Sequence, residues 1–242
     1  MLKKTLASII FIIFFSNNTL LFSKDIPIIV IAPSKKPQSA STVGTSVVVL
    51  DEEFLKNSNE YFLGDVLSSG ATSANFFQNG GHGSTSAIQL RGLPKRYSTV
   101  YIDGVKMSDP SSVSGDFDFN HILTSQISRV EILKGNQSSV YGSGAIGGTI
   151  NITTKKGKPG TRTNSMINSG SHGTLNYSAS YSGSDDFNNF YVGFERFQTD
   201  GMSAMTHNDE RDGYKNSSLI ANYSRELPNN FKLKSNLRFS DT

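Results

Sequence analysis

The chain has 242 residues and a formal net charge of only +3, so neither its size nor its charge indicates a nucleic-acid-binding protein. The absence of cysteine excludes disulfide bonds, thiol catalysis and cysteine-ligated metals. The chain also has 22 glycines and no tryptophan, a balance that favours many short strands and tight turns over a helical protein.

The first element is an apolar run that begins after Lys3 and Lys4 and ends at the polar residues 16–18. The run is shorter than the roughly 20 apolar residues that a membrane-spanning helix needs. A basic start followed by a short apolar stretch is typical of a secretory signal peptide, which we predict at residues 1–24. A retained N-terminal anchor is the alternative.

The next segment, residues 25–40, contains a short β-branched run between Pro27 and Pro33. Prolines at both ends keep such a run out of a central strand. A short apolar segment on a polar tether can pair with the edge of a partner's sheet as an added strand. The alternative is a first strand of the domain that follows. The candidate partner-contacting residues are Ile28, Ile29, Val30, Ile31 and Ala32.

Residues 41–157 are predicted to form a compact α+β domain. Asp51 can cap a first helix, and the Ser58–Asn59 pair can precede a second one at residues 61–67. The Asp103–Gly104 pair is a strong signal for a two-residue hairpin turn. Strands are predicted at residues 46–50, 87–90, 98–102, 105–107, 127–133 and 149–153.

A glycine-rich run at residues 142–147 satisfies the pattern G-x-G-x-x-G. A dinucleotide-binding loop must open a helix, whereas residues 148–154 are β-branched and alternate in polarity. The glycines are therefore interpreted as positions of tight packing and positive φ. Neither a nucleophile–base pair nor paired catalytic carboxylates stand out, so the chain is not expected to be an enzyme.

Residues 160–242 are predicted to be about five antiparallel strands. Apolar and polar residues alternate at residues 175–182, 218–224 and 231–239. Segments of roughly ten residues with this period are typical of a transmembrane β-barrel, and the same alternation occurs in a soluble sandwich. Tight turns at residues 183–186 and 227–230, together with a long polar stretch at residues 198–216, favour the barrel. Five strands cannot close a barrel around a domain, so the sequence is expected to hold only its start.

Several motifs in residues 28–154 resemble those of TonB-dependent outer-membrane receptors. The resemblance implies an α+β plug domain at residues 41–157, followed by the strands of a transmembrane β-barrel that this sequence does not complete. Residue 136 is Asn where the family usually has Pro, and residues 70–71 also depart from its pattern. The segments that carry the resemblance are residues 28–32 (similar to a TonB box), 65–67, 90–92, 101–105, 129–135 and 138–152.

The resemblance also implies sites. Two plug loops would face the ligand, and arginine side chains of two plug motifs would meet glutamates on the inner barrel wall. For Arg129, an ordinary pair with Glu131 inside the plug is the equally weighted alternative. The expected ligand-binding residues are Gln78, Asn79, Gly80, Gly81, His82, Ser84, Lys106, Met107, Ser108, Val113 and Ser114, and the expected docking residues are Arg91, Arg129 and Glu131.

The long polar loop near residue 210 contains several oxygen-bearing side chains. Hard cations such as Ca²⁺ bind oxygen ligands, and some cobalamin receptors order such loops with Ca²⁺. Arg211 in the middle of the loop favours the alternative of a solvated acidic loop. The candidate Ca²⁺ ligands are Asp209, Glu210 and Asp212, and no other cofactor is expected.

The resemblance implies TonB-dependent active uptake of a scarce ligand across the outer membrane of a Gram-negative cell. Residues 78–83 and 113–115 resemble plug loops of cobalamin transporters, so cobalamin is the first expected ligand and a ferric siderophore the second. The expected partners are TonB, the ligand and outer-membrane lipid, without nucleic acid. The alternative function is that of a secreted or surface β-rich adhesin without transport.

Overall fold

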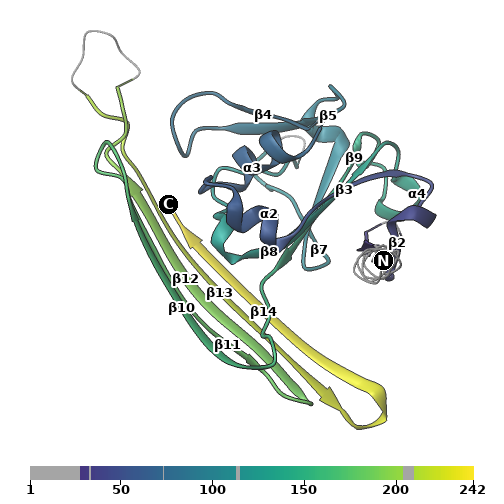
Figure 1. Ribbon diagram of the computed structural model, residues 1–242. Helices are drawn as coiled ribbons and strands as arrows, with labels where there is room; N and C mark the ends of the chain where they lie inside the picture. The colour runs from purple at the N-terminus through teal and green to yellow at the C-terminus, as the bar shows by residue number, and fades with distance from the viewer. Residues whose placement is uncertain (1–27, 33, 73, 113–114, 204–209) are drawn as a thin grey trace, which may run out of the picture.

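The computed structural model describes residues 28–32, 34–72, 74–112, 115–203 and 210–242. The predicted signal peptide, residues 1–24, lies outside these residues. The described chain has two bodies that lie side by side (Figure 1). One is a mixed body of strands and short helices, here called the plug. The other is a long, curved antiparallel sheet, here called the wall.

The plug is built around a five-stranded sheet in which only one strand pair, β6 with β9, is parallel. The predicted strands are confirmed, three with the predicted bounds and three longer by one residue at one or both ends. The predicted hairpin turn is also confirmed, because Asp103 and Gly104 both have positive φ, 50° and 86°. The strand order is β3 (Ser46–Leu50), β8 (Ile127–Lys134), β9 (Gly148–Thr154), β6 (Ser98–Ile102) and β7 (Val105–Met107).

The first helix of the plug, α2 (Glu52–Asn57), begins as predicted, because the Asp51 side chain accepts a hydrogen bond from Phe54 N at 2.9 Å. The second helix, α3 (Leu63–Gly70), begins later than predicted. Its N-cap residue, Phe62, has an extended backbone, pairs with Leu123 in an isolated bridge and is buried. Burial of this aromatic side chain therefore sets the start of the helix, and the Ser58–Asn59 pair does not. The other helical elements are α4 (Ser138–Tyr141), η1 (Ala40–Thr42), η2 (Lys95–Tyr97), η3 (Thr124–Gln126) and η4 (Pro228–Asn230).

Two small sheets complete the plug. Strand β4 (Ala74–Gln78), which the sequence did not predict, pairs with β5 (Ser86–Leu90). Strand β1 (Ile29–Val30) pairs with β2 (Gln38–Ser39), so the β-branched run after Pro27 is a strand of the chain's own fold in this structure.

The main core of the plug lies between helix α3 and the central sheet. Leu63, Val66 and Leu67 of the helix are fully buried in one cluster with Val130 and Ile132 of β8. Burying one such side chain contributes about 1.5–3 kcal/mol. This core gives the loops at the ends of the strands a rigid frame.

The wall contains five strands in sequence order, each antiparallel to the next. This confirms the predicted five strands and their alternation. Among the described residues, β10 and β14 each pair with a wall strand on one side only, so the wall is an open sheet rather than a closed barrel. The strands are β10 (Gly160–Ser169), β11 (Leu175–Ser184), β12 (Asn188–Thr199), β13 (Tyr214–Leu227) and β14 (Phe231–Asp241).

The two faces of the wall differ in chemistry. The face toward the plug carries buried polar groups, among them Asn176, Glu195 and Asn222. The opposite face carries large exposed apolar side chains such as Phe194 and Leu237. A polar inner face and an apolar outer face are the pattern of a barrel strand in an outer membrane.

No helix in the part of the chain that the structure describes is long and apolar enough to cross a membrane.

Candidate functional site

The residues predicted to contact a partner, residues 28–32, lie against the plug and are here called the coupling segment. Val30 and Ala32 are buried, whereas Ile29 and Ile31 are about half exposed, at 46% and 49%. The segment therefore presents one apolar face to the plug and one to solvent, as a half-buried strand does.

The backbone of the coupling segment is bound by side chains that lie about 100 residues away in the sequence. Glu131 Oε2 accepts hydrogen bonds from Ile31 N at 2.9 Å and Ala32 N at 2.7 Å. Arg129 Nη2 donates to the carbonyl of Ile29, and the Tyr141 hydroxyl donates to the carbonyl of Ala32. These three side chains, here called the clamp, bind main-chain groups and therefore hold the segment in one position regardless of its side chains.

The clamp is itself held together by an ion pair. Arg129 Nε donates to Glu131 Oε1 at 2.8 Å, and only 5% of the Glu131 side chain is exposed. This is the pairing inside the plug that the sequence left open as the alternative for Arg129. The structure thus brings two of the three predicted docking residues together on β8, where they face the coupling segment.

Arg91, the third predicted docking residue, lies in a tight turn that follows β5. Its φ is +54° and that of Gly92 is +75°, and both residues are exposed. In the described residues, no ion pair joins Arg91 to the wall.

The first predicted ligand loop, residues 78–86, connects β4 to β5. Its turn is closed by hydrogen bonds to one carbonyl, that of Gly81, from Gln78 Nε2 at 2.6 Å and Ser84 Oγ at 2.9 Å. Four successive residues of the loop are exposed: Asn79, Gly80, Gly81 and His82. The tip of this loop is therefore ordered by its own contacts and leaves polar groups open to solvent.

The second predicted ligand loop, residues 106–115, begins with the last two residues of β7. Lys106 and Ser108 are exposed, whereas Met107 packs against the plug core. Asp109 Oδ1 accepts hydrogen bonds from Ser111 N at 2.8 Å and Oγ at 2.6 Å, and these bonds lower the pKa of Asp109. Val113 and Ser114 lie outside the described residues.

An aromatic cluster joins the first loop to the wall. The His82 ring stacks on Phe62 with centroids 4.8 Å apart and meets Phe197 of β12 edge-on at 5.3 Å. Partial burial lowers the pKa of His82, while the nearby Asp65 carboxylate acts in the opposite direction. The His82 ring thus packs toward the wall, although the residue as a whole is exposed like the rest of the loop tip.

Below this cluster, Ser125 and Gln126 bind the plug to the wall. Ser125 Oγ donates to Glu195 of β12, which is 1% exposed and also accepts a bond from Asn176 at 3.1 Å. Gln126 Nε2 donates to the carbonyl of Ser218 at 3.2 Å. The glutamate partners predicted for the plug arginines were placed on further barrel strands, so this wall glutamate, which binds a serine, does not test that prediction.

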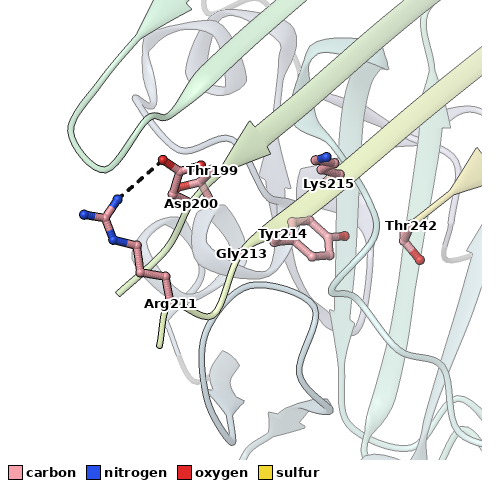
Figure 2. Close-up of a pocket in the computed structure, with 7 residues that line it drawn as sticks. All are labelled: Thr199, Asp200, Arg211, Gly213, Tyr214, Lys215 and Thr242. Carbon is pink, nitrogen blue, oxygen red and sulfur yellow. Dashed lines mark ion pairs between the residues drawn. The ribbon is translucent and has the colours of Figure 1, made fainter. Parts of the chain in front are cut away.

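A pocket of about 540 Å³ opens where β12 ends and β13 begins. Figure 2 shows the ion pair at its edge, in which Arg211 Nη1 lies 3.6 Å from Asp200 Oδ2. Glu210 and Asp212 are exposed here, and Asp209 lies outside the described residues. No group of three or more metal-binding side chains gathers in the part of the chain that the structure describes. The remaining pocket residues are Thr199, Gly213, Tyr214, Lys215 and Thr242.

The comparisons with known proteins agree with this architecture. Residues 39–149 match the family described as TonB-dependent Receptor Plug Domain. The vitamin B12 transporter BtuB of Vibrio vulnificus (strain CMCP6) is 27% identical over 220 residues, which are 88% of this chain and 35% of that protein. Residues 39–149 are therefore a TonB-dependent receptor plug domain.

Solved structures of an outer-membrane receptor and a siderophore receptor share the fold. The pyoverdine outer-membrane receptor FpvA from Pseudomonas aeruginosa PAO1 has a TM-score of 0.72 and 16% identity, covering 88% of this chain and 30% of FpvA. The siderophore receptor PiuA from Acinetobacter baumannii has a TM-score of 0.66 and 17% identity, covering 84% of this chain and 27% of PiuA. The chain thus spans about a third of the length of the relatives it matches.

Two features of the chain could not be predicted from its sequence. Tyr141 and Glu131 lie in segments that resemble the end of a plug, but nothing in their spacing indicates that both bind residues 28–32. The signal that could have found Glu131 is its chemistry, because a carboxylate among the apolar residues of β8 needs hydrogen-bond donors when it is buried.

Proposed function

We propose that the chain is the plug and the beginning of the barrel of an outer-membrane receptor that takes up a scarce ligand with energy delivered through TonB. The observation that carries the proposal is the coupling segment, a short strand held on the plug through its backbone. A partner that adds a strand recognises the same main-chain groups. TonB would therefore have to displace the clamp in order to pair with residues 28–32.

Cobalamin is the first ligand to test, because the relative named as a vitamin B12 transporter aligns with 88% of this chain. A ferric siderophore is the second, because several solved relatives are siderophore receptors. The exposed polar tip at residues 78–81 and the segment that follows β7 support a ligand site at this end of the plug. No covalent step is proposed.

The proposal is tested with Ile29→Pro in the receptor in its own membrane. Proline removes a backbone donor and fixes φ, so strand addition at this residue should fail. Uptake of radiolabelled cyanocobalamin should stop, while its binding to the cell surface stays at the wild-type level. Ile29→Val, which keeps the backbone donor, is the matched control and should transport normally. Normal uptake by Ile29→Pro would show that residues 28–32 do not contact TonB.

A further inference from the structure

Tyr214 is the first residue of β13 and follows directly after the loop that leaves β12. Its side chain points to the plug and is 8% exposed. In Figure 2 the ring is directed away from the Asp200–Arg211 ion pair that borders the same pocket. Tyr214 therefore lies between the start of β13 and two plug segments, residues 78–86 and 118–122.

The ring of Tyr214 holds the first of these segments, residues 78–86. The centroid of the Tyr214 ring is 6.2 Å from that of the His82 ring and 5.8 Å from that of the Phe62 ring. Gly83 has a φ of +85°, and a Cβ at this position would lie 2.5 Å from Tyr214 Cε2. The loop backbone thus approaches the ring as closely as a glycine allows.

The hydroxyl of Tyr214 holds the second segment, residues 118–122. It lies 2.9 Å from His121 Nδ1 and 3.4 Å from the carbonyl oxygen of Asn120, and it accepts a bond from Asn216 Nδ2 at 3.0 Å. Asn216 Nδ2 also donates to the carbonyl of His121 at 3.2 Å. The ring and the hydroxyl of Tyr214 therefore contact two different parts of the plug.

The two plug segments are also bound to each other. Ser86 Oγ donates to Asp118 Oδ1 at 2.6 Å, and Phe119 N donates to Ser86 Oγ at 3.2 Å. These bonds join the two segments at Ser86, whereas residues 79–85 make none of them.

We propose that Tyr214 is a positioning residue of the ligand site, which fixes the loop at residues 78–86 through its ring and the segment at residues 118–122 through its hydroxyl. The tip at residues 78–81 is thereby kept at the wall, facing the end where the β12–β13 loop begins. This inference rests on the proposed function, because it assigns to Tyr214 the placement of a loop proposed to bind the ligand.

Hydrogen exchange of the intact receptor distinguishes the role of the Tyr214 ring from that of its hydroxyl. Tyr214→Phe keeps the ring and removes the hydroxyl, so exchange should quicken by about fivefold at residues 119–122, the effect of losing one neutral hydrogen bond. Residues 79–85 should exchange at the wild-type rate in this variant. Tyr214→Leu removes the ring as well, and exchange should quicken in both segments.

Tyr223→Phe is the matched control. Tyr223 lies on the same strand but on the outer face, where its hydroxyl bonds to Asn188 Oδ1 at 3.0 Å. This variant loses one tyrosine hydrogen bond without touching the plug, so both plug segments should exchange at the wild-type rate. His82→Ala should quicken exchange at residues 79–85 more than at residues 119–122.

Binding of cyanocobalamin is the second measurement, and Tyr214→Leu should weaken it by about tenfold or more, whereas Tyr223→Phe should not. Wild-type exchange in both segments of both Tyr214 variants would overturn the inference. A uniform increase over the whole plug would overturn it too, because it would show a general loss of stability. If the wild-type receptor binds no cobalamin, the proposed ligand fails, and the segment-specific exchange still decides the role of Tyr214.

Discussion

Removal of the Glu131 carboxylate should release the coupling segment from the plug. Glu131 Oε2 accepts two backbone hydrogen bonds, from Ile31 and Ala32, and its other oxygen holds Arg129, which binds the carbonyl of Ile29. Glu131→Ala removes both acceptors at once and leaves the Arg129 guanidinium without its carboxylate partner.

The size of the effect follows from these contacts. A hydrogen bond to a charged group contributes about 1.5–3 kcal/mol, and the bond from half-exposed Ile31 belongs at the lower end of that range. The equilibrium for detachment should therefore shift by roughly 2–4 kcal/mol, or roughly 30- to 700-fold, in Glu131→Ala. Glu131→Gln keeps the shape and one acceptor oxygen, so its shift should be smaller, about 1 kcal/mol.

A spin label measures the release directly. The chain has no cysteine, so a single cysteine at the half-exposed position of Ile29 is a unique attachment site in it. The mobile fraction of the label should rise strongly in Glu131→Ala, and binding of the purified C-terminal domain of TonB should tighten without ligand. Glu52→Gln, which removes the exposed Lys158–Glu52 ion pair of 2.6 Å, is the control and should change neither quantity. A label that stays immobile in Glu131→Ala would refute the assignment of the clamp.

Four further predictions concern the end of the plug that faces the wall and the wall loop beside it. Because burial lowers the pKa of His82, its neutral form is favoured in the folded state, so stability should fall as pH drops through its ordinary pKa of 6.5; thermal unfolding of His82→Phe should lack this step. Burial raises the pKa of Asp65, so the protonated form of Asp65 is favoured in the folded state. Its contribution to stability is therefore present below pH 3.8 and is lost as the pH rises; Asp65→Asn should remove that dependence. Gly83→Ala should cost more than about 1 kcal/mol, measured by denaturant unfolding, because both its positive φ and the Tyr214 ring oppose a Cβ. If the loop near Asp212 binds Ca²⁺ as proposed from the sequence, calorimetric titration should show saturable heat that disappears in Asp212→Asn; no heat in the wild type would end that proposal.

The plug strands could be predicted because their signals are local. The β-branched runs of the central sheet and the Asp103–Gly104 turn both occur in the structure where the sequence places them. Strand β4 was missed, since Ala74–Gln78 is short and has no β-branched residue. The start of α3 was misplaced, because burial of Phe62 overrides the polar capping signal upstream.

The candidate sites were harder to predict, because they depend on residues far apart in the chain. The resemblance indicated the coupling segment, but not that Glu131 and Tyr141 bind its backbone across about 100 residues. It also implied arginine–glutamate contacts between the plug and barrel strands that this sequence does not hold, and that stays a prediction. In the described residues, Arg129 pairs with its neighbour Glu131, and wall residue Glu195 accepts a hydrogen bond from Ser125. Sequence spacing identifies neither partner, since both follow from the way β8 and β12 are placed in space.

The contacts between the plug and the five wall strands are unequal along their length. At the lower contacts, Gln126 with Ser218 and Thr154 with Asn222 form neutral hydrogen bonds. Such a bond contributes only about 1 kcal/mol, because the separated groups bond to water instead. At the upper end, Phe197 is 1% exposed and packs with the rings around Tyr214, and burying one aromatic side chain contributes about 1.5–3 kcal/mol. The aromatic contacts beside the loop at residues 78–86 should therefore bind the plug to the wall more firmly than either of these neutral hydrogen bonds does. The clamp lies on other elements, so a change there can reach the coupling segment while this loop stays in place.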